Sequence, residues 1–201
     1  MEKNDGFYKK ICTICVALVL MFGLGGCGTQ GEKEKQDYIE PAKLTEEEKD
    51  ILTLCGTKRN QHIFDFAVDG KTEVMQIRVS ELQDGQWQTI GKDSHDEIDE
   101  KGRFAIAGDD FGKSYSIGFT NGCTTWKSDE GKEKFPPLGV TTAVLTERTE
   151  IVYGKEIPVL IQITSSKSEV SIYNVEESFA HPERYKDAGH EHIYAISVIF
   201  C

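Results

Sequence analysis

Histidine and acidic side chains gather near the C-terminal end of the chain. His190 and His192 alternate ahead of a run of apolar residues, and His181, Glu183 and Asp187 precede them. Alternate residues of a strand face the same side, so the two imidazoles could bind one zinc-like ion while the other three side chains complete its shell. The spacing matches no established metal motif, and an ordinary polar loop before a final strand is the plainer interpretation. The cluster is therefore a candidate metal site.

The first 27 residues have the pattern of an export signal. Lysines precede an apolar run of about 14 residues between Ile11 and Leu24, in the order that is typical of a secretory signal peptide. The run ends in Leu24-Gly25-Gly26-Cys27, which resembles the bacterial lipobox. This resemblance implies a lipoprotein that is cleaved before Cys27, carries a palmitate-type diacylglyceryl lipid on the Cys27 sulfur, and lies at the extracytoplasmic face of the cell membrane.

The residues that follow Cys27 are expected to form a tether. Residues 28–36 include no apolar side chain and mix both charges, so they cannot bury enough surface to fold. A diacylglyceryl group supplies two chains, which anchor a protein stably where one chain does not. We therefore expect a cleaved signal peptide over 1–26, a lipidated flexible tether over 27–43 and a single globular domain over 44–201.

The charge of the chain limits its partners. The chain has 23 Lys and Arg against 34 Asp and Glu, a formal charge of -11, and the residues after Gly26 alone carry about -12. Proteins that bind nucleic acid concentrate basic residues on one face, so nucleic acid is excluded as a partner. Anionic membrane surfaces attract polybasic segments, so membrane contact is expected through the lipid alone.

Three cysteines lie beyond the lipobox, and they are Cys55, Cys123 and Cys201. An odd number allows one disulfide and one thiol, and the sequence does not choose among the three pairings. Three reduced cysteines are equally consistent with it, because a free cysteine packs as a small hydrophobe. A thiol enzyme would need a base beside the sulfur of Cys123, and nothing in the sequence places a histidine there.

A short helix is expected to open the domain. Thr45 and Glu48 form a capping-box pattern, in which each side chain accepts a hydrogen bond from the backbone N–H of the other residue. Ile51, Leu52 and Leu54 then give an apolar patch. We expect a helix over 46–55 that packs this patch against a sheet.

The hydrophobic period then changes from that of a helix to that of strands. Phe64 and Phe66 alternate with polar residues, as do Met75, Ile77 and Val79, which indicates strands with one buried face. Asp69-Gly70 lies between these two runs and Asp84-Gly85 follows the second. Asp-Gly is a strong hairpin signal, so we expect a hairpin at each.

The remaining strands are expected at regular spacing, with a turn at Asn121-Gly122. Their ranges are 103–107, 114–120, 142–153, 157–164 and 192–200. Short strands that Gly, Asp and Asn turns separate favour an antiparallel β-sandwich or a barrel-like meander. The fold is therefore expected to be mainly β with one short N-terminal helix.

Trp126 is the aromatic residue with the clearest functional interpretation. It follows the turn at Asn121-Gly122, where a half-exposed indole could contact a sugar or a peptide, although core packing explains most aromatic residues at strand period. We expect a non-catalytic binding module for an envelope protein, a peptide or a glycan. The alternative is an envelope enzyme that depends on a thiol or on a metal bound by His181, His190 and His192.

Overall fold

The computed structural model describes most of the chain after the expected tether. The described residues are 36–54, 61–70, 72–96, 98–127, 139–166, 170–186 and 189–201. The expected signal peptide, Cys27, Cys55 and Asp187 lie outside them.

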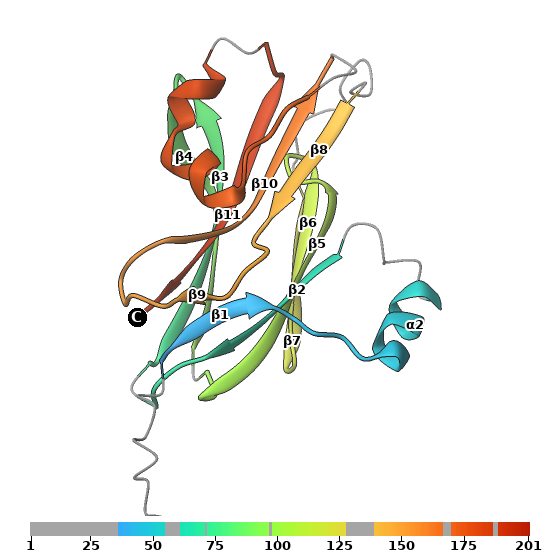
Figure 1. Ribbon diagram of the computed structural model, residues 1–201, viewed down its shortest axis with the longest axis vertical. Coiled ribbons are helices and arrows are strands. Elements are labelled where there is room, and N and C mark those ends of the chain that lie inside the picture. The colour runs from blue at the N-terminus through green and yellow to red at the C-terminus, as the bar shows by residue number, and fades with distance from the viewer. Residues whose placement is uncertain are drawn as a thin grey trace, which may run out of the picture. The chain divides into compact units, whose positions relative to one another are not determined.

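The fold is a sandwich of two antiparallel sheets (Figure 1), as the sequence predicts. The six strands of the first sheet, here called sheet A, are in spatial order β7 (Gly122–Lys127), β6 (Ser114–Phe119), β5 (Lys101–Asp110), β2 (Gln61–Ala67), β1 (Tyr38–Pro41) and β9 (Thr149–Glu150). The five strands of sheet B are β4 (Gln86–Asp96), β3 (Val74–Gln83), β11 (His192–Phe200), β10 (Ile157–Ser165) and β8 (Gly139–Val144).

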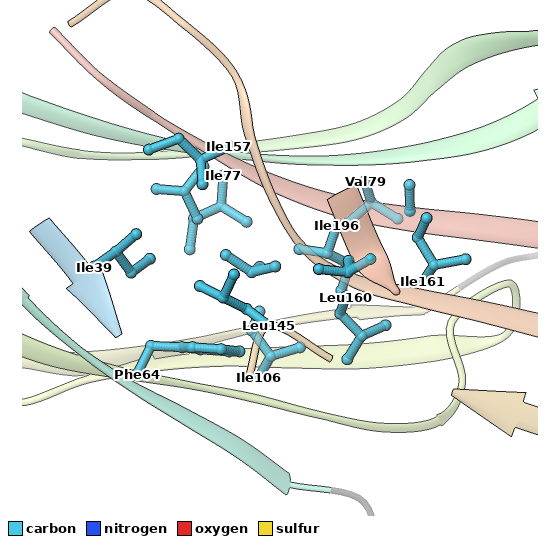
Figure 2. Close-up of a cluster of buried hydrophobic side chains, with 14 of the residues drawn as sticks. Ile39, Phe64, Ile77, Val79, Ile106, Leu145, Ile157, Leu160, Ile161 and Ile196 are labelled. Atoms are coloured by element: carbon cyan, nitrogen blue, oxygen red, sulfur yellow. The ribbon is translucent and has the colours of Figure 1, made fainter. Parts of the chain in front are cut away.

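Apolar side chains fill the space between the two sheets. Phe64 and Ile106 of sheet A face Ile77, Leu160 and Ile196 of sheet B, as Figure 2 shows, and all five are at most 1% exposed. Apolar and polar residues alternate in the sequences of β2 and β3, and buried and half-buried residues alternate along the two strands in the same way. The predicted strands are therefore confirmed here, with their apolar face inward.

A helical layer covers the other face of sheet B. Helix α3 (Val175–Ala180) packs on β10, and the single turn η1 (Pro182–Tyr185) lies beside β4. Strands β10 and β11 are consequently buried along nearly their whole length, which explains why consecutive apolar residues occur in both. Neither helical element is predicted from the sequence.

Two identical Asp-Gly pairs have different outcomes. Asp84 and Gly85 have φ values of 53° and 79° and join β3 to β4 as a hairpin, as predicted. The hairpin predicted at Asp69-Gly70 is wrong, because β2 pairs with β1 and β5 whereas β3 pairs with β4 and β11. The chain crosses from sheet A to sheet B at this point.

Two expected boundaries also differ from the structure. The strand predicted over 142–153 is divided into β8 of sheet B and β9 of sheet A, because the chain changes sheets between them. Strand β1 lies within the expected tether over 27–43, and it pairs with β2 and β9. Ile39 is fully buried in the core, so the folded part of the chain begins before residue 44.

Helix α2 (Glu46–Leu54) forms as predicted, but its packing differs from the prediction. Thr45 N–H donates to Glu48 at 2.7 Å and Glu48 N–H donates to the Thr45 hydroxyl at 3.2 Å, which completes the capping box. The helix has no buried residue, and Leu54 is 87% exposed. The expectation that its apolar patch packs against a sheet is therefore wrong.

An ion pair ties α2 to sheet A instead. The Arg103 guanidinium on β5 donates to Glu48 at 2.6 Å and to both carboxylate oxygens of Asp65 on β2 at 2.6 and 3.1 Å. The pKa of the Glu48 carboxyl is lowered by the Thr45 backbone N–H and by Arg103.

Among the described residues no helix is long and apolar enough to cross a bilayer.

One buried side chain joins the two sheets through hydrogen bonds. Gln162 of β10 is 2% exposed, accepts a hydrogen bond from the Phe111 N–H at 3.0 Å, and donates to the Asp109 carbonyl at 3.2 Å. Both partners belong to sheet A, Asp109 to the end of β5 and Phe111 to the connection between β5 and β6. The amide therefore satisfies two backbone groups at this end of the sandwich.

Replacing the Gln162 amide tests how much its two hydrogen bonds between the sheets contribute to the free energy of unfolding. Gln162→Leu keeps much of the side-chain volume but leaves the buried Phe111 N–H and the Asp109 carbonyl without this partner. We expect a loss of about 2 to 4 kcal/mol in the free energy of unfolding, measured by urea denaturation. The exposed Gln88→Leu is the matched control and should change stability by less than about 0.5 kcal/mol. Equal effects of the two substitutions would contradict the assignment.

Candidate functional site

A polar pocket lies at one end of sheet B. It has a volume of about 230 Å³ and is here called the histidine pocket. Three segments form it: the end of β3 with the β3–β4 turn, the end of η1, and the entry to β11. The residues that line it are Leu82, Asp84, Gly85, Tyr185, Lys186, His190, Glu191, His192 and Ile193.

A carboxylate holds one of the two histidines in this pocket. The Nδ1 atom of His192 lies 2.8 Å from Oε1 of Glu81 on the neighbouring strand β3. The other carboxylate oxygen of Glu81 accepts a hydrogen bond from Gln83 at 2.8 Å. The ring of Tyr194 lies nearly parallel to that of His192, with the centroids 5.8 Å apart. These contacts fix the orientation of the His192 imidazole.

The helical layer supplies the opposite wall of the pocket. The Tyr185 ring is buried, and its hydroxyl lies 2.7 Å from the Ser178 hydroxyl of α3. Trp87 of β4 donates its indole N–H to the Phe179 carbonyl at 2.9 Å and stacks on the Phe179 ring at 5.4 Å. The wall is therefore attached to the sheet by aromatic packing and hydrogen bonds.

The pocket has the chemistry of a polar recognition site. Lys186 brings a positive charge, Asp84 and Glu191 bring negative charges, and the two imidazoles donate or accept hydrogen bonds. Whole small molecules usually occupy pockets of about 300–1,000 Å³, so this smaller pocket suits a short polar group or a side chain. A carboxylate on the second nitrogen of a histidine is also the arrangement that orients metal ligands.

The structure separates the residues that the sequence grouped as a metal site. His190 and His192 line the same pocket, but His181 ends α3 and pairs with Glu183 at 3.1 Å in an exposed position outside the pocket lining. The pKa of the Glu183 carboxyl is lowered by its own backbone N–H and by His181. Within the described ranges, three His, Cys, Asp or Glu side chains nowhere come together as they would around a metal ion.

The described cysteines are separate from the histidine pocket. Cys123 on β7 is exposed and its sulfur donates to the Thr124 carbonyl at 3.8 Å, and Cys201 follows β11 as a second free, exposed thiol. These two form no disulfide with each other. Cys123 belongs to sheet A, whereas His192 and the Glu81 that holds it belong to sheet B.

Trp126 is half-buried on β7. Its ring stacks on Tyr115 of β6, with centroids 5.3 Å apart and planes at 19°, and packs against the core. Tyr115 is itself buried, and burial raises the pKa of its hydroxyl, with a further contribution from Asp93. One face of the indole therefore packs against the edge of the sandwich. The ligand contact predicted for Trp126 stays a prediction.

Sequence reasoning missed three residues that shape the pocket. Glu81, Tyr185 and Lys186 lie 111, 7 and 6 residues from His192 along the chain. The alternation of β3 places Glu81 on a strand, but only the pairing of β3 with β11 brings it to His192. Besides His190 and His192, the sequence signalled the Asp84-Gly85 turn, which also lines the pocket.

Removing one hydroxyl of the buried Ser178–Tyr185 pair tests whether the pair holds the helical wall of the pocket. Tyr185→Phe removes the partner of the Ser178 hydroxyl and keeps the ring, so we expect a loss of about 1 to 2 kcal/mol in the free energy of unfolding, measured by urea denaturation. Tyr173→Phe in the same region is the control, because the Tyr173 side chain is 51% exposed. A Tyr185→Phe protein as stable as the control would show that the hydroxyl pair does not hold the wall.

Comparison of the chain with known proteins gives no family assignment. No protein-family model, curated protein or solved structure matches it. The histidine pocket and the surfaces of the sandwich are therefore the basis on which a function is argued.

Proposed function

We propose that this protein is a lipoprotein of the extracytoplasmic membrane face whose β-sandwich binds a partner molecule. Cys27 carries the lipid in this proposal, and the domain itself performs no reaction. The ligand is an envelope protein, a peptide or a glycan that contacts the domain at its surface. The observation that carries the proposal is the lipobox, Leu24 to Cys27, ahead of a filled β-sandwich.

The arrangement of the domain supports a binding role. Apolar side chains fill the interior, so polar groups are presented at the ends and edges of the sheets, where loops commonly bind ligands. The histidine pocket is such a site, and its Glu81–His192 pair is held on two paired strands. Groups that are held on paired strands keep a fixed geometry, which lowers the entropy cost of binding.

The charge supports attachment through the lipid alone. A formal charge of -11 opposes contact with an anionic bilayer. Two acyl chains hold a protein stably on a membrane without such contact. The binding surfaces then face away from the lipid.

The anchor is tested by replacing the cysteine that would carry it. Only a thiol forms the thioether to the lipid, so in Cys27→Ala we expect complete loss of incorporation of a labelled palmitate analogue, with the domain still folded by circular dichroism. Cys15→Ala lies in the apolar run and is the control that keeps the label. Labelling of the Cys27→Ala protein would refute the proposed anchor.

A metal-dependent enzyme is the second candidate, because Glu81 orients His192 as a carboxylate orients a metal-bound histidine. Zinc titration by calorimetry of the full chain and of His190→Ala/His192→Ala separates the two functions. The binding role predicts that the double substitution leaves the zinc heat unchanged. Saturable heat that disappears with the two imidazoles would establish the metal site and favour the enzyme.

A further inference from the structure

Among the described residues, strand β8 is an edge of sheet B, and its own sequence lacks the usual protection of sheet edges. It pairs with β10 on one side, and within the part of the chain that the structure describes no strand pairs with its other side (Figure 1). Its sequence, Gly139–Val144, contains neither a charge nor a proline, whereas exposed edges commonly carry one or the other, or a bulge. Strand β4, at the opposite edge of the sheet, has a register shift and carries Lys92 and Asp93.

The outer edge of β8 presents its backbone amides in a defined direction. The Leu145 N–H donates to the Val159 carbonyl at 2.9 Å, and the register of β8 with β10 continues from this pair. In an antiparallel ladder the amides alternate in direction, so those of Val140, Thr142 and Val144 point away from β10. Val140 is 49% exposed.

An acidic cavity adjoins the C-terminal end of β8. It has a volume of about 140 Å³ and lies between residues 144–147 and 174–176. Glu147 and Glu176 line it together with Thr146, Asn174 and three apolar residues, and the Thr149 hydroxyl donates to Glu176 at 3.4 Å. Because it is well below the roughly 300 Å³ of a typical ligand pocket, it has the size for one side chain. The two carboxylates favour a cationic one.

We propose that β8 binds an extended segment of a partner protein as an additional antiparallel strand, with a Lys or Arg of that segment in the cavity between Glu147 and Glu176. Main-chain hydrogen bonds supply affinity in such strand addition, and side-chain pockets supply specificity. The formal charge of -11 favours a cationic partner over a second copy of this chain. This inference rests on the proposed binding role and adds its surface and the chemistry of its partner.

The probe is a labelled peptide, acetyl-Lys-Thr-Val-Thr-Ile-Thr-amide, whose N-terminal lysine would lie beside the cavity in an antiparallel pair. Binding to the full-length lipidated protein in detergent is measured by fluorescence anisotropy. Two further peptides carry N-methyl groups on one or the other set of alternating amides. Only one set can face β8, so we expect one of these peptides to bind about tenfold more weakly or worse and the other to bind nearly as the parent does.

Substitutions in the protein separate the edge from the cavity. Val140→Pro removes an amide that points outward and should weaken the parent peptide by about tenfold. The double substitution Glu147→Gln/Glu176→Gln should weaken binding of the parent peptide by about fivefold. A peptide with glutamate in place of lysine should bind the unsubstituted protein and this variant equally. Glu46→Gln/Glu47→Gln makes the same change of charge on α2 and should alter binding by less than about twofold. Circular dichroism checks that each variant is folded.

Three outcomes would overturn the inference: no binding up to about 1 mM peptide, equal effects of the two N-methylated peptides, or a dimer in sedimentation that Val140→Pro abolishes. The last would make a second copy the occupant of the edge. Any of these results in a protein that still carries lipid on Cys27 would reject the strand-addition site and leave the proposed anchored binding role standing. Loss of the lipid would instead reject the proposed function.

Discussion

The burial of β10 and β11 on both faces is the constraint on which the rest of the structure depends. These two strands are buried at almost every position and carry apolar residues on both faces, so sheet A covers one face and a further layer must cover the other. Helix α3 and the turn η1 are that layer, held by Trp87 and by the Ser178–Tyr185 hydroxyl pair. The histidine pocket lies where the chain leaves this layer to enter β11, so its position follows from the packing of the core.

Polar contacts complete the structure where apolar packing ends. Gln162 bonds to the end of β5 and to the β5–β6 connection, and Arg103 bonds to Asp65 and to Glu48. Both cases place a side chain from one element against groups from another, so each contact fixes the relative position of two segments. Helix α2 is attached in this way by charge, and its Ile51 and Leu54 side chains remain exposed.

The proposed anchor and the proposed binding surfaces divide the work between different parts of the chain. A lipid on Cys27 would supply membrane affinity that the acidic domain surface does not. The histidine pocket and the β8 edge are formed by sheet B, and they offer different chemistry: mixed charge in the pocket, and backbone groups beside an acidic cavity at the edge.

The sequence by itself determined the features of the fold that depend on local interactions. The capping box of Thr45 and Glu48, the Asp84-Gly85 hairpin and the alternation of β2 and β3 depend on residues close together in the chain, and all three are confirmed. For the candidate site the sequence identified His190 and His192, but not the pairing of β3 with β11 that brings Glu81 to His192. Only the tertiary structure decided which strands share a sheet. Asp69-Gly70 has the same local chemistry as Asp84-Gly85, yet it joins two sheets, because the burial of whole strands outweighs the preference of a single turn.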